Sequence, residues 1–223
     1  MQQKIQPRLP FIVSLNDLAK EIFVLIPKLF FSFQYLSMLL TKVKVGKVTN
    51  LSDARYCAGM GVDYLSFPIS AVSQKMYREI TAWVAGPKFG IKVDSEDPEL
   101  IEAYDADFIE MTIDQFSQFS GDRKLIVTLS TEDWPKKKMK LMQAKERILY
   151  LELASTVIED PVLKIIEEMA EDFKILVNHC ANFNFEILKP PIAGISLQGD
   201  PEASPGLKEY PLSKILERLE AAD

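Results

Sequence analysis

The sequence predicts an α/β fold of the (β/α)8 class, a TIM barrel, preceded by an extra apolar segment. From residue 41 onward, short runs rich in β-branched and aromatic residues alternate with helical stretches. Eight such runs occur, and the helix-length connections between them force neighbouring strands to be parallel. A doubly wound open sheet is the alternative, but that fold does not need eight evenly spaced units.

The predicted strands are short and regularly spaced along the chain. They are Val43–Val48, Tyr64–Phe67, Phe89–Val93, Phe108–Thr112, Leu125–Leu129, Leu149–Leu153, Lys174–Asn178 and Ala193–Leu197. Cap-like residues begin the helices between them: Asn50 before LSDARYCAG, and Asp-Pro pairs at 97–98 and 160–161. Each strand is thus followed by a helix start, as a repeated β/α unit requires.

The chain divides by composition into an apolar N-terminal extension, residues 1–40, and the barrel, residues 41–223. Phe23–Leu40 is long enough to approach a membrane span, yet its leucines also recur at the three- and four-residue steps of a packing helix. It is a poor signal peptide, because Asp17 and Glu21 precede the apolar run. A third reading is an upstream extension of the reading frame before Met38. A membrane anchor is the least favoured, and we expect residues 1–37 to be dispensable for the barrel.

Composition narrows the class of function. The 223 residues are 48% hydrophobic and 26% charged, as in ordinary globular proteins. The net charge of −6 argues against a nucleic-acid partner, and the basic run at 136–140 is typical of a solvated helix face. Cys57 and Cys180 have no C-x-x-C spacing, so we expect reduced thiols and a cytoplasmic protein. With one histidine, His179, no metal site is predicted, although carboxylate-only sites stay open.

Two stretches at opposite ends of the barrel are specific. KVGKVTNLSDARYCAGMGVDYLSF, Lys44–Phe67, resembles the first β/α unit of phosphoribosylanthranilate isomerase, whose pattern is K-I-C-G-I-T, D-A-x-x-A and G-A-D-x-x-G-F. GISLQGDPEASPGLKEY, Gly194–Tyr210, resembles the family's last strand and loop, G-V-D-V-S-S-G-V-E-x-x-P-G-x-K-D. The resemblance implies a (β/α)8 barrel of tryptophan biosynthesis.

The resemblance also implies a reaction. The family performs an Amadori rearrangement of an aminoaldose to an aminoketose with a general acid, a general base and no cofactor. The family's base is the cysteine of K-I-C-G, and this position is Gly46, followed by Lys47 in place of glycine. The best match to its acid, an aspartate, is Glu152. An equally weighted reading is that Glu152 pairs with a basic neighbour inside the barrel.

The family's binding groups are also replaced. Its S-P-R becomes Ser73-Gln74-Lys75, so Lys75 offers at most a point charge where an arginine faces the anthranilate group. The chain has no glycine between Gly121 and Gly194, where the family keeps phosphate-binding glycine loops. In the last loop, S-S-G becomes Gln198-Gly199-Asp200, and the Asp200 carboxylate repels a phosphate dianion.

Other residues are predicted to line the C-terminal mouth of the barrel. His179 is a weak candidate for a replacement base, and it cannot readily reach Cys180 because adjacent strand residues point to opposite faces. Further candidates at strand ends are Lys92, Asp94, Glu110 and Thr112. The leading hypothesis is an isomerase-like barrel, a pseudoenzyme candidate, with lost or altered activity and a small phosphorylated or sugar-like ligand. The alternatives are an active isomerase with substituted residues and a non-catalytic binding or scaffold barrel.

Overall fold

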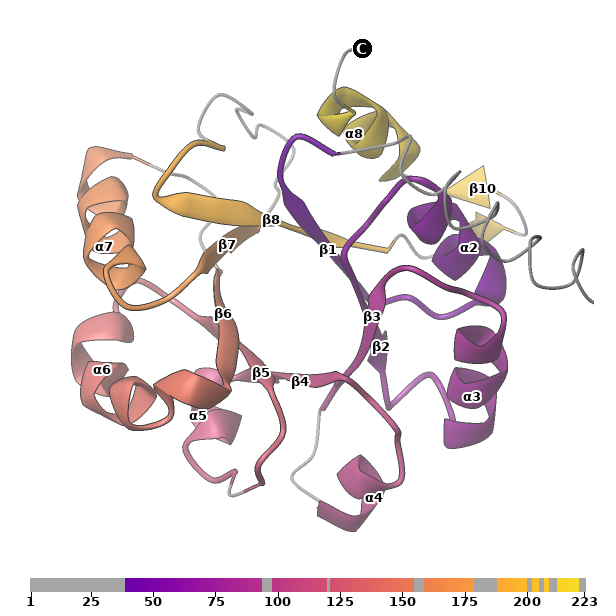
Figure 1. The fold of residues 1–223 in the computed structure, drawn as a ribbon, viewed down its shortest axis with the longest axis horizontal. Helices are drawn as coiled ribbons and strands as arrows, with labels where there is room; N and C mark the ends of the chain where they lie inside the picture. Colours follow the sequence, from indigo (N-terminus) through magenta and orange to yellow (C-terminus); the bar gives the residue numbers. More distant parts are fainter. Residues whose placement is uncertain are drawn as a thin grey trace, which may run out of the picture. The chain divides into compact units, whose positions relative to one another are not determined.

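Eight parallel strands form the barrel. They are β1 (Lys42–Gly46), β2 (Tyr64–Pro68), β3 (Lys88–Lys92), β4 (Phe108–Thr112), β5 (Leu125–Leu129), β6 (Ile148–Leu153), β7 (Ile175–Asn178) and β8 (Ile192–Gln198). Each strand pairs in parallel with the next along the chain, and β8 pairs with β1, so the barrel is closed. The predicted (β/α)8 fold is therefore confirmed (Figure 1).

The structure is a computed structural model that describes residues 39–93, 98–119, 121–154, 159–178, 188–199, 202–204, 207–208 and 212–220. The predictions about residues 1–38 lie outside this part of the chain, and the division at residue 40 stays a prediction. Within the described part, every helix is too short or too polar to cross a membrane.

Helices surround the ring of strands on its outer side (Figure 1). They are α2 (Leu51–Gly59), α3 (Gln74–Ala82), α4 (Pro98–Glu102), α5 (Ile113–Phe116), α6 (Trp134–Gln143), α7 (Asp160–Ala170) and α8 (Leu212–Leu219), with a 3-10 turn η1 (Lys145–Arg147) before β6. A small antiparallel pair, β9 (Glu202–Ser204) and β10 (Leu207–Lys208), precedes α8. Because helices cover the outside, strand residues that point outward are buried as completely as those that point inward.

The starts of the helices follow the capping residues that the sequence indicates. The Asn50 side chain accepts a hydrogen bond from the Asp53 backbone N–H at 2.9 Å, so Asn50 caps α2 as predicted. The prediction for α7 is off by one residue: Glu159 is the cap, and Asp160 is the first residue of the helix. At the strand ends, β1 stops earlier than predicted because Lys47 has φ 54°, in the left-handed region, which no strand contains.

The barrel interior near the strand starts is apolar. We call the side chains there the apolar plug: Tyr64, Phe108, Ile126, Tyr150 and Leu176. The Tyr64 ring meets the rings of Phe108 and Tyr150 edge-to-face, with centroids 5.7 and 5.4 Å apart. Such packing closes the N-terminal end of the barrel with side chains.

Gly90 on β3 makes room for the apolar plug. A Cβ atom built on Gly90 would lie 2.3 Å from the Phe108 ring, closer than any real contact. The Phe108 ring therefore lies directly against the backbone of β3, and no other residue fits at position 90 without displacing the ring.

Candidate functional site

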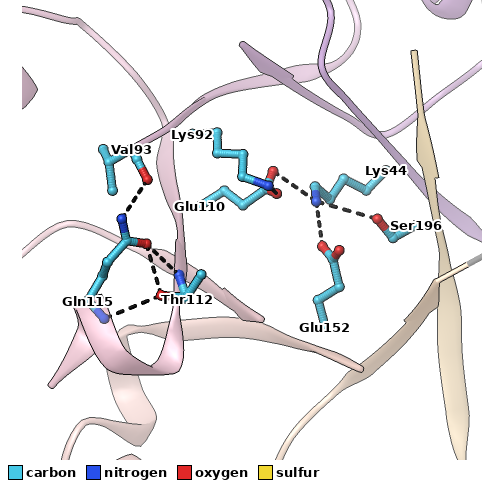
Figure 2. Close-up of polar contacts among 8 residues, drawn as sticks. All are labelled: Lys44, Lys92, Val93, Glu110, Thr112, Gln115, Glu152 and Ser196. Atoms are coloured by element: carbon cyan, nitrogen blue, oxygen red, sulfur yellow. Dashed lines mark hydrogen bonds and ion pairs between the residues drawn. The ribbon is translucent and has the colours of Figure 1, made fainter. Parts of the chain in front are cut away.

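The C-terminal ends of the strands, where barrels of this class carry their sites, hold a cluster of charged side chains. We call it the charged quartet: Lys44 from β1, Lys92 from β3, Glu110 from β4 and Glu152 from β6. The four side chains converge inside the barrel (Figure 2). Strand alternation places them there, because their sequence neighbours point outward into the core beneath the helices.

Lys44 is the centre of the charged quartet. Its Nζ lies 2.8 Å from Glu110 Oε2 and donates a hydrogen bond to Glu152 (Figure 2). It also lies 3.4 Å from Ser196 Oγ on β8. Lys92 Nζ completes the cluster at 3.4 Å from Glu110 Oε1. Two ammonium groups and two carboxylates therefore balance one another.

The members of the charged quartet need opposite charges nearby because most of them are buried. The side chains of Lys44, Glu110 and Glu152 are at most 2% exposed, whereas Lys92 is 29% exposed. Burial lowers the pKa of Lys44, but the attraction of Glu110 and Glu152 outweighs it and raises that pKa above its ordinary value. Burial raises the pKa of Glu110, but Lys44 and Lys92 outweigh it and lower that pKa. At neutral pH Lys44 is therefore an ammonium ion, which cannot serve as a base or a nucleophile.

Glu152, the predicted acid, lies in this cluster. Its carboxylate is 2% exposed and accepts a hydrogen bond from Lys44, so the structure shows the pairing with a basic neighbour that the sequence left open. A general acid must come within hydrogen-bond reach of the atom that it protonates. An acid role for Glu152 thus requires a substrate to reach into the cluster, and that role stays a prediction.

The position of the family's base lies beside Gln198. Gly46 and Gln198 are partners at the ends of β1 and β8. A Cβ built on Gly46 would lie 3.1 Å from Gln198 Oε1 and 3.3 Å from Nε2, so a side chain at position 46 would require the Gln198 carboxamide to shift slightly. The Gly199 backbone N–H donates to the Gly46 carbonyl at 2.6 Å and ties the two strand ends together.

The remaining predicted site residues lie elsewhere or outside the described chain. Lys75 is in the first turn of α3, where its side chain is 86% exposed and its Nζ lies 3.8 Å from Glu79 Oε1. A role for Lys75 in substrate binding stays a prediction. His179 and Asp200 lie outside the described residues, as does Asp94.

The hydroxyl group of Thr112, another residue predicted to line the mouth, takes part in capping a helix. The Thr112 side chain accepts a hydrogen bond from the Gln115 backbone at 3.3 Å, and Gln115 Oε1 accepts one from the Thr112 backbone at 2.8 Å. Gln115 Nε2 also donates to the Val93 carbonyl at 2.9 Å (Figure 2). This capping box begins α5 and anchors it to the end of β3.

The sequence prediction missed Lys44, which holds the site together. The signal was available: Lys44 stands between Val43 and Val45 in a strand, and alternation places it on the same face as Gly46, inside the barrel. A lysine at an inward position must find buried carboxylates. For metals, the described residues contain no group of three His, Cys, Asp or Glu side chains able to hold an ion.

Comparisons with known proteins support the fold. No family model matches the chain, and no curated protein sequence matches it. Several solved structures do match the chain. Phosphoribosylanthranilate isomerase from Thermotoga maritima is similar with a TM-score of 0.58 at 16% identity over 80% of this chain and 97% of that one.

Two further structures agree. A phosphoribosyl anthranilate isomerase in complex with reduced 1-(o-carboxyphenylamino)-1-deoxyribulose 5-phosphate has a TM-score of 0.57 at 14% identity, over 80% of this chain and 97% of that one. The enzyme from Thermus thermophilus has a TM-score of 0.55 at 15% identity, over 80% and 96%. At such identities the likeness concerns the fold. The described chain has the barrel fold of phosphoribosylanthranilate isomerases, as its two resembling stretches predict.

Proposed function

We propose that this chain is a phosphoribosylanthranilate isomerase-like barrel that has lost or altered the isomerase reaction. The observation that carries the proposal is at the place of the base, where Gly46 has no side chain. The acid is constrained as well, by the buried pairing of Glu152 with Lys44. The carboxylate best placed to act as the acid is already bound to an ammonium group of its own chain. A substrate has to reach this buried carboxylate before the carboxyl group can act on it.

The place of the base lacks a group that can accept a proton. Gly46 has no side chain, and Gln198 occupies the space beside it. A carboxamide does not take up a proton at neutral pH, so it cannot replace a thiolate. The absence of a positioned base costs about 10² to 10⁴ in rate.

We further propose that the mouth still binds a small phosphorylated or sugar-like ligand. The barrel fold is shared with an isomerase that holds a phosphorylated sugar derivative in its structure. The charged quartet leaves Lys92 partly exposed at this end of the barrel, which favours a negatively charged molecule. A partly exposed Lys92 can attract such a ligand, while Gly46 provides no base to isomerise it.

The test is turnover of phosphoribosylanthranilate by the purified full-length protein, followed as the decrease in anthranilate fluorescence. We expect a rate at or near the detection limit. We also expect Gly46→Cys to recover little, because the replaced binding groups would still hold the substrate poorly. Robust turnover that Glu152→Gln abolishes would instead establish the active isomerase, and complementation of an isomerase-deficient tryptophan auxotroph would show the same.

A further inference from the structure

A cavity lies at the N-terminal end of the barrel, where β1 and β8 begin. Its volume is about 440 Å³, which is within the range of about 300 to 1,000 Å³ for small-molecule sites. The Thr41 hydroxyl donates to the Ala193 carbonyl at 3.4 Å and joins two of its walls. The apolar side chains that line it are Leu39, Leu40, Leu188, Pro190, Ile192 and Ala193.

Two charged side chains also line this cavity, and they have opposite signs. Lys42 Nζ lies 2.6 Å from Asp63 Oδ1, and Asp63 Oδ2 accepts a hydrogen bond from the Val43 backbone N–H at 3.0 Å. The hydrogen bond with Asp63 raises the pKa of Lys42, so Lys42 is an ammonium ion at neutral pH. The two side chains are 59% and 23% exposed. Because an ammonium group has three donors and a carboxylate about four acceptor positions, both can also bind a ligand.

The closeness of these two charges determines which ligand fits. A molecule with only a carboxylate would pair with Lys42 but would lie close to the Asp63 carboxylate, which repels it. A molecule with only an ammonium group would meet the reverse. A zwitterion whose two charges are neighbours can pair with both residues and leave their own ion pair intact. An α-amino acid carries its ammonium and carboxylate groups on one carbon atom in this way.

From the cavity, its pair of charges and its apolar walls, we propose a binding site for a free α-amino acid with an apolar side chain. The α-carboxylate pairs with Lys42, the α-ammonium group pairs with Asp63, and the side chain lies against the apolar walls. The site is at the end of the barrel opposite the charged quartet. It is therefore independent of the proposed function, which concerns the mouth.

The experiment is isothermal titration of the full-length protein with L-leucine and with two analogues of the same shape. 4-Methylpentanoate lacks the ammonium group, and 3-methylbutylamine lacks the carboxylate. We expect leucine to bind about fivefold or more tightly than either analogue, because only leucine can pair with both charges. Absence of leucine binding, or equal binding of leucine and either analogue, would overturn the proposal.

A charge variant separates recognition from a structural role. Lys42→Gln should weaken leucine binding about fivefold or more and should strengthen binding of 3-methylbutylamine, since Asp63 then has no neutralising ammonium beside it. A lysine that only stabilised the fold would not exchange the two preferences. Lys88→Gln is the matched control, because Lys88 is an exposed lysine at the start of β3 and does not line the cavity. Unchanged leucine binding in Lys42→Gln would contradict the proposal.

Leu40→Glu keeps the proposal testable if Lys42→Gln fails to fold. Leu40 lines the cavity and is 68% exposed, so its replacement leaves the core intact. We expect weaker leucine binding, because the apolar wall is lost and a second carboxylate is added. If a second copy of the chain covered this face, light scattering would give twice the mass of one chain, Leu40→Glu would halve it, and leucine would not bind. That result would overturn the proposal, whereas turnover in the isomerase assay bears only on the proposed function.

Discussion

The barrel interior is apolar near the N-terminal ends of the strands and charged near their C-terminal ends. The apolar plug is held by burial and by edge-to-face ring contacts around Tyr64. The charged quartet is held by ion pairs around Lys44. Loss of a group from the plug removes contacts in proportion to its size. Loss of a group from the quartet leaves a buried charge without its partner.

This difference bears on function. In barrels of this class the N-terminal end serves stability and the C-terminal end carries the site. Here the polar groups of the C-terminal end bind one another, with Lys44 bridging Glu110 and Glu152. The half of the barrel that usually receives a substrate is therefore partly closed by the chain's own charges, while Lys92 stays accessible.

The largest effect should follow from breaking the charged quartet. Lys44→Met leaves Glu110 and Glu152 buried without their shared partner, and we expect a loss of about 3 to 5 kcal/mol in the free energy of unfolding. Urea denaturation followed by circular dichroism measures it. Lys42→Met is the matched control on the same strand, because Lys42 is 59% exposed and its pair with Asp63 lies at the surface. That variant should lose about 1 kcal/mol or less.

If the two lysine variants were equally stable, the contrast between the halves of the barrel would be wrong. The charged quartet would then contribute no more than a surface ion pair. A loss confined to Lys44→Met would instead show that the ion pairs, and not the aliphatic part of the lysine, hold the C-terminal half together.

A smaller effect should follow from crowding the apolar plug. Gly90→Ala places a methyl group where the Phe108 ring lies, and we expect a loss of about 1 to 3 kcal/mol from overpacking. Phe108→Leu should offset part of this loss in the double variant, because it removes the ring that the methyl group meets. Urea denaturation of the two single variants and the double variant gives the coupling. Additive losses would show that the ring and the glycine do not depend on each other.

Much of the fold was predictable because it depends on local pattern. All eight strands appear within two residues of their predicted ends, since β-branched runs and caps act over a few residues. The early end of β1 at Gly46 was not predicted, and the one signal for the left-handed backbone of Lys47 is that the family's pattern has glycine at this position. Glycine is the residue expected in that conformation.

The site was predictable in part, since the sequence offered a basic partner for Glu152 inside the barrel but did not identify Lys44 as that partner. Gly46 was expected at the place of the family's base and Gln198 in the last loop, and the structure pairs the two residues at the ends of β1 and β8. The contact of Lys44 with Glu152 joins residues 108 positions apart, through the register of the closed barrel. No local pattern encodes such a contact. The contact between Lys44 and Glu152 forms because the closed sheet brings β1, β4 and β6 around one interior.

The smallest effect is expected from pH across the neutral range. The pKa of Glu110 is lowered in the folded protein, so its contribution to stability is present above its unfolded pKa and is lost as pH falls through the folded pKa. The pKa of Lys44 is raised, so its contribution is present below its unfolded pKa and is lost as pH rises through the folded pKa. Stability from this pair should therefore stay constant between about pH 5 and about pH 10.

Below about pH 4 the free energy of unfolding should fall, and Glu110→Gln should make that fall shallower by up to about 1.4 kcal/mol per pH unit, the effect of one proton. The variant should keep some acid dependence, because the pKa values of Asp133 and Glu168, held by Ser130 and by Lys138, are also lowered. Urea denaturation from pH 3 to pH 8 measures both slopes. If the free energy of unfolding fell equally steeply with falling pH in the two proteins, Glu110 would not take up a proton on unfolding. The charged quartet would then not be the ionised cluster described above.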